Sequence, residues 1–291
     1  MTDGDGTGTP FDERHPQAAE QYPVRPGTAR PARVRPLGWW YIAEHYARHL
    51  RAFLVSELML ALGTPLLYVL AFGAGLGVLV DTTSGGVDGV PYLTFLLPAL
   101  VCSGALMLAS QQYTYTVFSG FKWQPVFLAM SATSLVPWHI LGGVVVFALL
   151  RILPGAVVFT VIGALVGAVP LPTGALLVPI ALLLGTAALP IAAWVGAQRE
   201  DRGQLNFVER FVVVPLMLFS GTYYPLEVLP QPLQALGWAS PLWHAVELGR
   251  AASYGHDPGP GALPLHLAVL VLYALTGAVL AERIFRKRLT A

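Results

Sequence analysis

The chain has 291 residues, of which 55% are hydrophobic and only 11% are charged, and its net charge at pH 7 is +1. Soluble domains usually carry about 25% charged residues, so this composition excludes a soluble enzyme, a disordered protein and a nucleic-acid-binding protein. It predicts an all-α polytopic membrane protein, as the mean hydropathy of +0.62 also indicates.

Residues 1–37 have a composition of their own, with six prolines, four glycines and scattered charge. Such a segment cannot bury enough apolar area to offset the entropy that it would lose on ordering. We predict that it is a disordered cytosolic tail.

Residues 38–53 have the periodicity of an amphipathic helix. The apolar side chains that recur at spacings of three and four are Trp39, Ile42, Tyr46, Leu50 and Phe53. Aromatic anchors with cationic flanks suit a helix that lies in the membrane interface. The alternative is a cytosolic extension of the first span.

Six apolar stretches follow, and each is close to the ~20 residues that a bilayer core of ~30 Å requires. We predict transmembrane helices at about 54–80, 92–118, 140–168, 175–197, 207–225 and 260–282. The break between the third and fourth helices carries strong turn residues, Pro170-Leu171-Pro172-Thr173-Gly174. The fifth helix is short, and the long side chain of Arg210 can extend it by reaching the interface.

The positions of Lys and Arg predict the orientation. With both termini in the cytosol, 15 of the 17 Lys and Arg residues lie on the cytosolic side, Arg250 lies outside and Arg151 lies within a span. This distribution follows the positive-inside rule. It includes a basic cytosolic tail at 283–291 and predicts a multi-pass protein of the plasma (cytoplasmic) membrane.

The outside segment between the last two spans, residues 227–257, is mostly apolar. Pro225 lies just before this segment, and Pro230, Pro232 and Pro241 interrupt it. A solvated loop would be more polar, and proline is favoured in the first turn of a helix. We predict two short re-entrant helices in the outer leaflet.

Motifs for nucleotide or metal binding are absent from the sequence. Neither of its two lysines, Lys122 and Lys287, follows a glycine, so it lacks the G-x-x-x-x-G-K-[ST] loop that binds phosphates. His244 and Glu247 are spaced like two metal ligands on a helix, but two ligands do not make a site. We predict that this chain binds no metal or cofactor and has no catalytic residues.

A resemblance to a known family rests on the segment 219–255, whose key residues are Phe219-Ser220-Gly221, Pro225, Leu229-Pro230, Pro241-Leu242 and Arg250. This pattern resembles the C-terminal signature of ABC-2 type exporter permeases. Residues 125–135 resemble the cytosolic segment of the nodulation-factor and daunorubicin-resistance branch, with Ser134 in place of a proline, and the glycine-rich stretch at 66–77 resembles the end of its first span. The resemblance covers roughly residues 40–285.

The resemblance implies one ABC-2 type transmembrane domain at 38–285 with the layout already predicted from the charges. It also implies two partners, a separate ATPase subunit that binds ATP and Mg and a second permease copy in a homodimer. The complex would export an amphipathic or lipid-linked substrate, such as a drug, a lipo-oligosaccharide or a glycan.

The resemblance further places an ATPase-coupling helix between spans two and three, at Gly120, Phe121, Lys122, Trp123 and Phe127. Aromatic side chains that fill a pocket are strong interface anchors. The alternative is an interfacial helix that touches only lipid. The charged residues 199–202 are a second candidate contact, with a plain solvated loop as the alternative.

Polar residues inside the spans are candidates for a substrate pathway. They are Gln111, Gln112 and Tyr115 in span two, and Ser220, Tyr223 and Tyr224 at the outer end of span five. Polar groups at membrane depth are costly unless they are paired or face water. Hydrogen bonding between helices and an aromatic belt are the respective alternatives.

Arg151 is the costliest residue of the spans, because an isolated arginine at the bilayer centre costs at least ~2.5 kcal/mol. Glu57 is the only acidic residue of the first span. We therefore hypothesise an intramembrane charge pair between Glu57 and Arg151. Arg151 could instead meet an anionic substrate or a lipid headgroup.

A membrane-embedded enzyme acting on a lipid is the alternative function. It would require a convergent catalytic cluster, for which only His139, His244, Glu247 and His266 are available.

Overall fold

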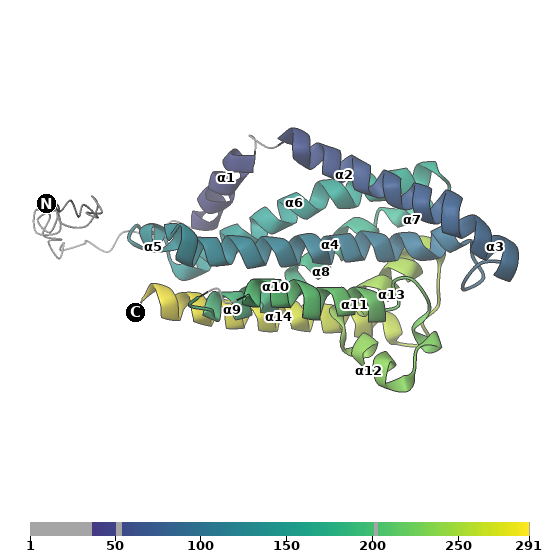
Figure 1. Cartoon of the computed structure of the whole chain (residues 1–291). Coiled ribbons are helices and arrows are strands. Elements are labelled where there is room, and N and C mark those ends of the chain that lie inside the picture. The colour runs from purple at the N-terminus through teal and green to yellow at the C-terminus, as the bar shows by residue number, and fades with distance from the viewer. Residues whose placement is uncertain (1–36, 51–53, 201–202, 291) are drawn as a thin grey trace, which may run out of the picture. The chain divides into compact units, whose positions relative to one another are not determined.

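The computed structural model describes residues 37–50, 54–200 and 203–290, so all of the predicted tail except Leu37 lies outside the described residues. Within these ranges the regular elements are helices, apart from one isolated bridge between Val87 and Val90. Among the described residues, five helices are long and apolar enough to cross a membrane. The chain is thus a multi-pass helical membrane protein, and Figure 1 shows its long helices running back and forth beside one another.

The helices follow one another along the chain in the predicted order. The first half contains α1 (Gly38–Leu50), α2 (Leu54–Val69), the π-helical η2 (Leu70–Gly77), α3 (Val78–Ser84), α4 (Tyr92–Phe118), the π-helical η3 (Ser119–Trp123), α5 (Val126–Ser131) and α6 (Pro137–Leu165). The second half contains α7 (Leu171–Gly174), α8 (Leu177–Ala187), α9 (Leu189–Ala197), α10 (Gln204–Val208), the π-helical η4 (Glu209–Val213), α11 (Val214–Phe219), the 3₁₀ turn η5 (Leu226–Val228), α12 (Gln231–Ala239), α13 (Pro241–Tyr254) and α14 (Ala262–Leu289).

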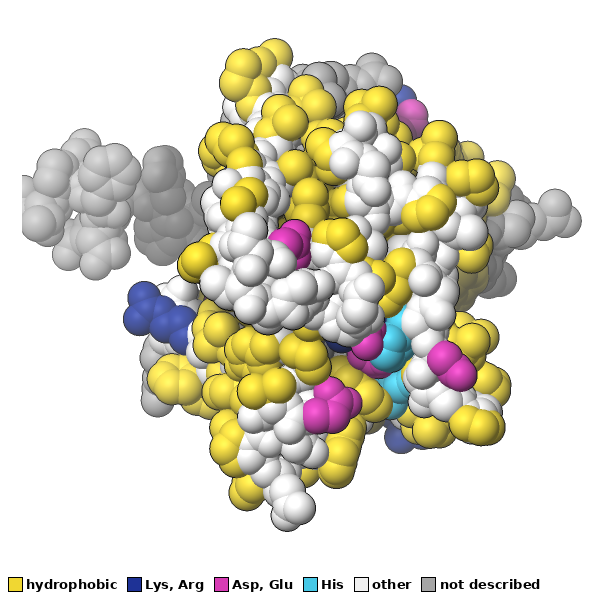
Figure 2. Space-filling model, turned by 90° about the vertical axis from the view of Figure 1, so that its right-hand side faces the viewer, with side chains coloured by type: hydrophobic (Ala, Val, Ile, Leu, Met, Phe, Trp, Pro, Cys, Tyr) yellow, Lys and Arg dark blue, Asp and Glu magenta, His cyan; other side chains and the backbone are white. Residues whose placement is uncertain are grey.

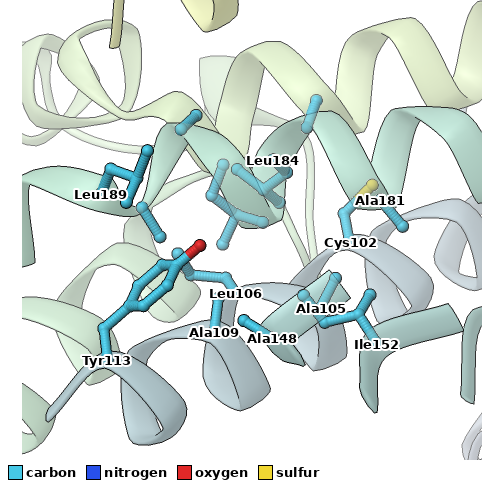
Figure 3. Packing of buried hydrophobic residues seen from close by; sticks show 14 of the residues in the cluster. Cys102, Ala105, Leu106, Ala109, Tyr113, Ala148, Ile152, Ala181, Leu184 and Leu189 are labelled. Atoms are coloured by element: carbon cyan, nitrogen blue, oxygen red, sulfur yellow. The ribbon is translucent and has the colours of Figure 1, made fainter. Parts of the chain in front are cut away.

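Helix α4 is the centre of the bundle. In the most apolar part of the Tyr92–Trp123 helix 72% of the residues are buried, against 11% for the first candidate span, Val55–Ser84. Figure 3 shows the small side chains of Ala105 and Ala109 facing α6 and the α8–α9 pair. Small residues let helix backbones approach closely, which is how helices gain packing energy in lipid.

Helix α1 packs on α6 through a glycine. Ile42 and Ala43 are almost fully buried, whereas Trp40 and Tyr41 on the opposite side are about half exposed. A Cβ atom on Gly143 of α6 would lie 2.5 Å from the side chain of Ile42. The amphipathic pattern therefore corresponds to a helix with one face against the bundle, and the remaining predicted part, residues 51–53 including Phe53, lies outside the described residues.

The segment predicted as the fifth span is shorter than expected. Elements α10, η4 and α11 form one helical run, Gln204–Phe219, instead of 207–225. At 1.5 Å per residue this run is about 24 Å long, and it does not reach the length of the five candidate spans. It ends at Ser220 because Gly221 adopts a left-handed φ of 69°.

Two short helices follow, as the prolines predicted. Pro232 and Pro241 occupy first-turn positions of α12 and α13, and Ser240 Oγ accepts a hydrogen bond from the Leu242 N–H at the start of α13. Figure 1 shows both helices at the end of the bundle that carries α3 and α7, opposite α5 and the C-terminal end of α14. We call the first the α12 end and the second the α5 end. Entry of α12 and α13 into a leaflet stays a prediction.

The glycine contact between α1 and α6 yields a first prediction. Gly143→Val should lower the free energy of unfolding by about 1–3 kcal/mol, the usual cost of overpacking, because its side chain would collide with Ile42. Unfolding by SDS titration in mixed micelles measures this change. The control is Gly155→Val in the same helix, where a Cβ meets nothing within 4 Å; equal losses in both variants would contradict the prediction.

Candidate functional site

A polar network crosses the bundle at membrane depth. The Nη2 atom of Arg151 on α6 lies 2.6 Å from Oε1 of Glu57 on α2. The Nη1 atom of Arg151 donates to Oε1 of Gln112 on α4 at 2.8 Å. The Gln112 amide in turn donates to the hydroxyl of Thr116 one turn further along α4. The structure thus places the two members of the hypothesised charge pair in contact and joins three helices through them.

The network gives Gln112 the alternative role from the sequence analysis, a hydrogen bond between helices. Its side chain is buried and binds Arg151, so it does not line an open pathway. The guanidinium of Arg151 presents several donors in a planar fork, and a carboxylate and an amide oxygen satisfy two of them. This is the arrangement that a charged group in an apolar medium requires.

A second carboxylate lies on another side of α4. Glu209, in the π-helical η4, accepts a hydrogen bond from Ser110 Oγ at 3.3 Å, and the Gln111 side chain also interacts with it. Glu209 was not selected from the sequence. The available signal was its position: it lies inside the predicted span 207–225, where an acidic residue is costly.

The remaining predicted pathway residues differ in exposure and in hydrogen-bond partners. Tyr115 is 49% exposed. Ser220 is buried and donates to Ser240 Oγ at 2.7 Å. The Tyr223 carbonyl accepts from the Tyr92 hydroxyl at 3.2 Å, and the Tyr224 hydroxyl donates to the Leu218 carbonyl at 2.8 Å. The assignment of these residues to a substrate pathway stays a prediction.

The predicted coupling segment lies at the α5 end and divides into a buried and an exposed part. Phe121 and Phe127 are buried, and their rings contact Phe285 of α14 with centroid distances of 4.9 and 5.5 Å. Gly120 is in contact with Phe127, whose ring would lie 2.4 Å from an added Cβ. Lys122 and Trp123 are exposed. The buried members position this segment, and the exposed members are available to a partner.

The loop after α9 is adjacent to the same segment in space. Arg288 of α14 donates to the carbonyls of Gly196 and Gln198 at 3.0 Å, and its guanidinium lies 4.2 Å from the centroid of the Phe121 ring. Two residues of the second candidate contact at 199–202, Asp201 and Arg202, lie outside the described residues.

A buried charge cluster lies at the α12 end, and the sequence analysis did not predict it. Arg250 is 3% exposed; it pairs with Glu247 at 3.0 Å, donates to the Gly221 carbonyl at 2.6 Å and lies 3.8 Å from the centroid of Phe95. The available signal was that Arg250 is the one Lys or Arg predicted outside, within an apolar segment. The cluster fixes α13 to α4 and to the end of α11.

The cluster continues to the surface through a histidine. His256 Nδ1 lies 2.7 Å from Asp88, and His256 Nε2 lies 3.2 Å from Glu247. The Tyr254 hydroxyl donates to Asp88 at 3.0 Å, and burial raises the pKa of this tyrosine. Figure 2, which looks onto this end, shows histidine beside acidic side chains.

Of the four residues considered for metal binding or catalysis, His244 and His266 contact each other, and Glu247 and His139 have other partners. Glu247 binds Arg250, whereas His244 Nδ1 lies 2.7 Å from His266 Nδ1 and its Nε2 lies 3.0 Å from the Trp238 carbonyl. His139 accepts a hydrogen bond from the Val136 N–H. No group of three or more His, Cys, Asp or Glu in the described ranges could hold a metal ion. Within these ranges the residues do not converge on a catalytic centre.

Comparisons with known proteins agree with the helical membrane architecture. Residues 46–254 match the family model described as ABC-2 type transporter. The chain is 28% identical to "Nodulation protein J" of Neorhizobium galegae over 81% of its own length and 87% of the relative's. It is 26% identical to the Sinorhizobium fredii protein of the same name, over 89% and 98% of the two chains. No solved structure matches the chain.

The Glu57–Arg151 pair yields a second prediction. In a double-mutant cycle of Glu57→Gln and Arg151→Gln, we expect a coupling energy of about 1–3 kcal/mol, because each single change leaves a charge without its partner. SDS titration in mixed micelles measures the four proteins. The control cycle uses the exposed pair Glu44 and Arg48 of α1, for which we expect less than about 0.5 kcal/mol. Additive losses at Glu57 and Arg151 would contradict the prediction.

The buried cluster yields a third prediction. Arg250→Met should lower the free energy of unfolding by about 3–5 kcal/mol, because the buried Glu247 carboxylate would lose the arginine cation and keep only the His256 imidazole at 3.2 Å. Arg286→Met is the control, since Arg286 is exposed on α14 and lies 3.9 Å from Glu282; it should change stability by under about 0.5 kcal/mol. The same SDS titration compares them, and losses of similar size would refute the assignment of a structural role to Arg250.

Proposed function

The chain belongs to the ABC-2 type transporter family, and on this basis we propose that it is the membrane-spanning permease subunit of an exporter. It moves an amphipathic or lipid-linked substrate, such as a drug, a lipo-oligosaccharide or a glycan, out of the cell. A separate subunit binds ATP and Mg and hydrolyses the nucleotide, because this sequence has no phosphate-binding loop. The family match over most of the chain is the observation that carries the proposal.

We propose six membrane crossings with both termini in the cytosol. The run Gln204–Phe219 would be the fifth crossing, in addition to the five long helices. Its position supports this assignment, since Figure 1 shows α9 ending and α10 beginning toward the α5 end, while α12 follows α11 at the opposite end. The run is shorter than the bilayer core. The bilayer would become thinner around it, or the residues after Phe219 would complete the crossing. In this orientation the α5 end faces the cytosol and the plasma membrane surrounds the bundle.

The coupling surface is proposed at Lys122 and Trp123. Both are exposed at the π-helical end of α4, and Phe121, Phe127 and Gly120 hold this turn against α14. An exposed tryptophan on a rigid support has the properties of an interface anchor. Because α4 is the most buried of the five candidate spans, a displacement of its end by a moving ATPase would be transmitted to the middle of the bundle.

The second permease copy is proposed to contact the first span. Along the α2–η2–α3 helix many large apolar side chains are exposed, including Met59, Leu67 and Leu79. Lipid covers such a surface in a monomer, and a second copy covers part of it in a homodimer. The substrate pathway would then form where Gln111, Tyr115 and the outer residues Ser220, Tyr223 and Tyr224 approach the partner.

Co-purification tests the proposal. A tagged permease extracted gently from its native membranes should carry an ATPase chain in stoichiometric amount. Lys122→Ala combined with Trp123→Ala should reduce the bound ATPase at least tenfold, because the exposed anchor is lost while the buried aromatic support stays intact. Quantitative staining of the purified complex measures the ratio.

The control is Trp238→Ala on α12, an equally exposed tryptophan (54% against 53% for Trp123) at the opposite end of the bundle. It should retain the ATPase. A permease that purifies without any ATPase would contradict the exporter assignment. Retention of the ATPase by the double variant would contradict the position of the coupling surface.

A further inference from the structure

An apolar cavity of about 430 Å³ opens beside the proposed fifth crossing. Its walls come from α4, the α8–α9 pair, α11, the α12–α13 segment and α14, with Leu106, Ile191, Leu216 and Tyr273 among the lining residues. Cavities of a few hundred cubic ångströms bind small molecules when a few polar groups fix the ligand's orientation. The polar groups that face this one are already committed, since Ser220 binds Ser240 and the Tyr273 hydroxyl binds the Ala239 carbonyl.

The Glu209 carboxylate lies about one helical turn from the cavity wall. Along its own helical run, Val212 follows Glu209 by three residues and lines the cavity. Along α4, Leu106 lines the cavity and precedes Ser110, the partner of Glu209, by four residues. Since a helical turn rises about 5.4 Å, both helices place Glu209 and its partner Ser110 about one turn beyond the end of the cavity lining, to which neither residue belongs.

Glu209 has weak compensation for a partly buried carboxylate. Its hydrogen bonds come from two uncharged side chains, the Ser110 hydroxyl at 3.3 Å and Gln111, and within the described ranges no ion pair joins it to a cation. Arg151 on α6 is engaged by Glu57 and Gln112, and Arg210, the residue after Glu209, is exposed. Ionisable residues inside spans are usually paired or functional, and π-helical turns such as η4 are common at functional sites.

We propose that the cavity and Glu209 together form a binding site for a cationic amphiphile, with the apolar body in the cavity and the positive group at the carboxylate. The site deepens the proposed function, on which its role in transport rests, by assigning a substrate class. Ser110 and Gln111 orient the carboxylate, and the ligand's charge supplies the compensation that the protein does not.

Two probes of similar shape and opposite charge test the site. Octyltrimethylphosphonium and octyltrifluoroborate, which carry the charge at one end of an apolar chain, are titrated by calorimetry into the purified permease in phosphatidylglycerol nanodiscs, with protein-free nanodiscs subtracted. Glu209→Gln should weaken phosphonium binding at least tenfold, because the charge is lost while hydrogen bonding to Ser110 is retained. Binding of the borate should stay equal or become tighter.

Further variants separate charge from shape. Leu216→Trp, which fills the cavity, should weaken binding of both probes. Glu227→Gln is the matched control, since it removes a carboxylate from η5 at the α12 end, and it should change neither affinity. Wild-type phosphonium affinity in Glu209→Gln, an equal loss of both probes in that variant, or no binding to the wild type would each overturn the proposal.

The measurement also distinguishes the source of the cation. If phosphatidylethanolamine added to the nanodiscs competes with the phosphonium, the occupant is a bilayer lipid with an ammonium group. If it does not compete, the site selects a compound that is not part of the bilayer. Because the permease is titrated without an ATPase, failure of this site leaves the co-purification result unaffected, and the reverse also holds.

Discussion

Three residues within about one turn of α4 connect it to helices on several sides. Ser110 binds Glu209 of η4, Gln112 binds Arg151 of α6, and the hydroxyl of the buried Tyr113 donates to the Gly185 carbonyl of α8 at 3.0 Å. Successive side chains of an α-helix point about 100° apart, so the side chains of this short stretch reach neighbours on most sides of α4. In a bilayer the apolar surfaces of helices do not discriminate between a neighbouring helix and lipid. These directional bonds therefore fix which helix lies where, and the rest of the packing follows from them.

The two ends of the bundle are held by different chemistry. At the α5 end the rings of Phe121, Phe127 and Phe285 pack together beneath the Arg288 guanidinium. At the α12 end, charge pairs and hydrogen bonds around Arg250 connect segments that are far apart in sequence. An aromatic cluster tolerates small displacements because dispersion is not directional, whereas a buried ion pair does not. This difference is consistent with a movable end on the side of the proposed ATPase and a stiffer end on the other side.

The sequence allowed most of the helices to be located, because gaps between charges and proline-rich turns mark the ends of apolar helices. It could not define the end of the fifth segment. That end depends on the left-handed backbone of Gly221, and the sequence does not distinguish this glycine from any other glycine in an apolar stretch. It also could not separate Phe121 and Phe127 from Trp123, because periodicity does not distinguish an aromatic anchor on the surface from one in the core. The pairing of His256 with Asp88 depends on tertiary structure alone. The contact of Glu57 with Arg151 was easier to predict, since Glu57 is the only acidic residue of the first span and an arginine inside a span requires a partner.

The order of residues along the chain also bears on how the protein is made. The acceptors of the Arg151 guanidinium, Glu57 on α2 and Gln112 on α4, both precede it in the sequence. Glu57 lies near the start of its helix, where a carboxylate can stay among lipid headgroups until a later segment arrives. Arg151, in the middle of α6, is synthesised last of the three. During co-translational insertion Arg151, the side chain whose transfer into the membrane costs the most free energy, thus enters a membrane that already holds both of its acceptors.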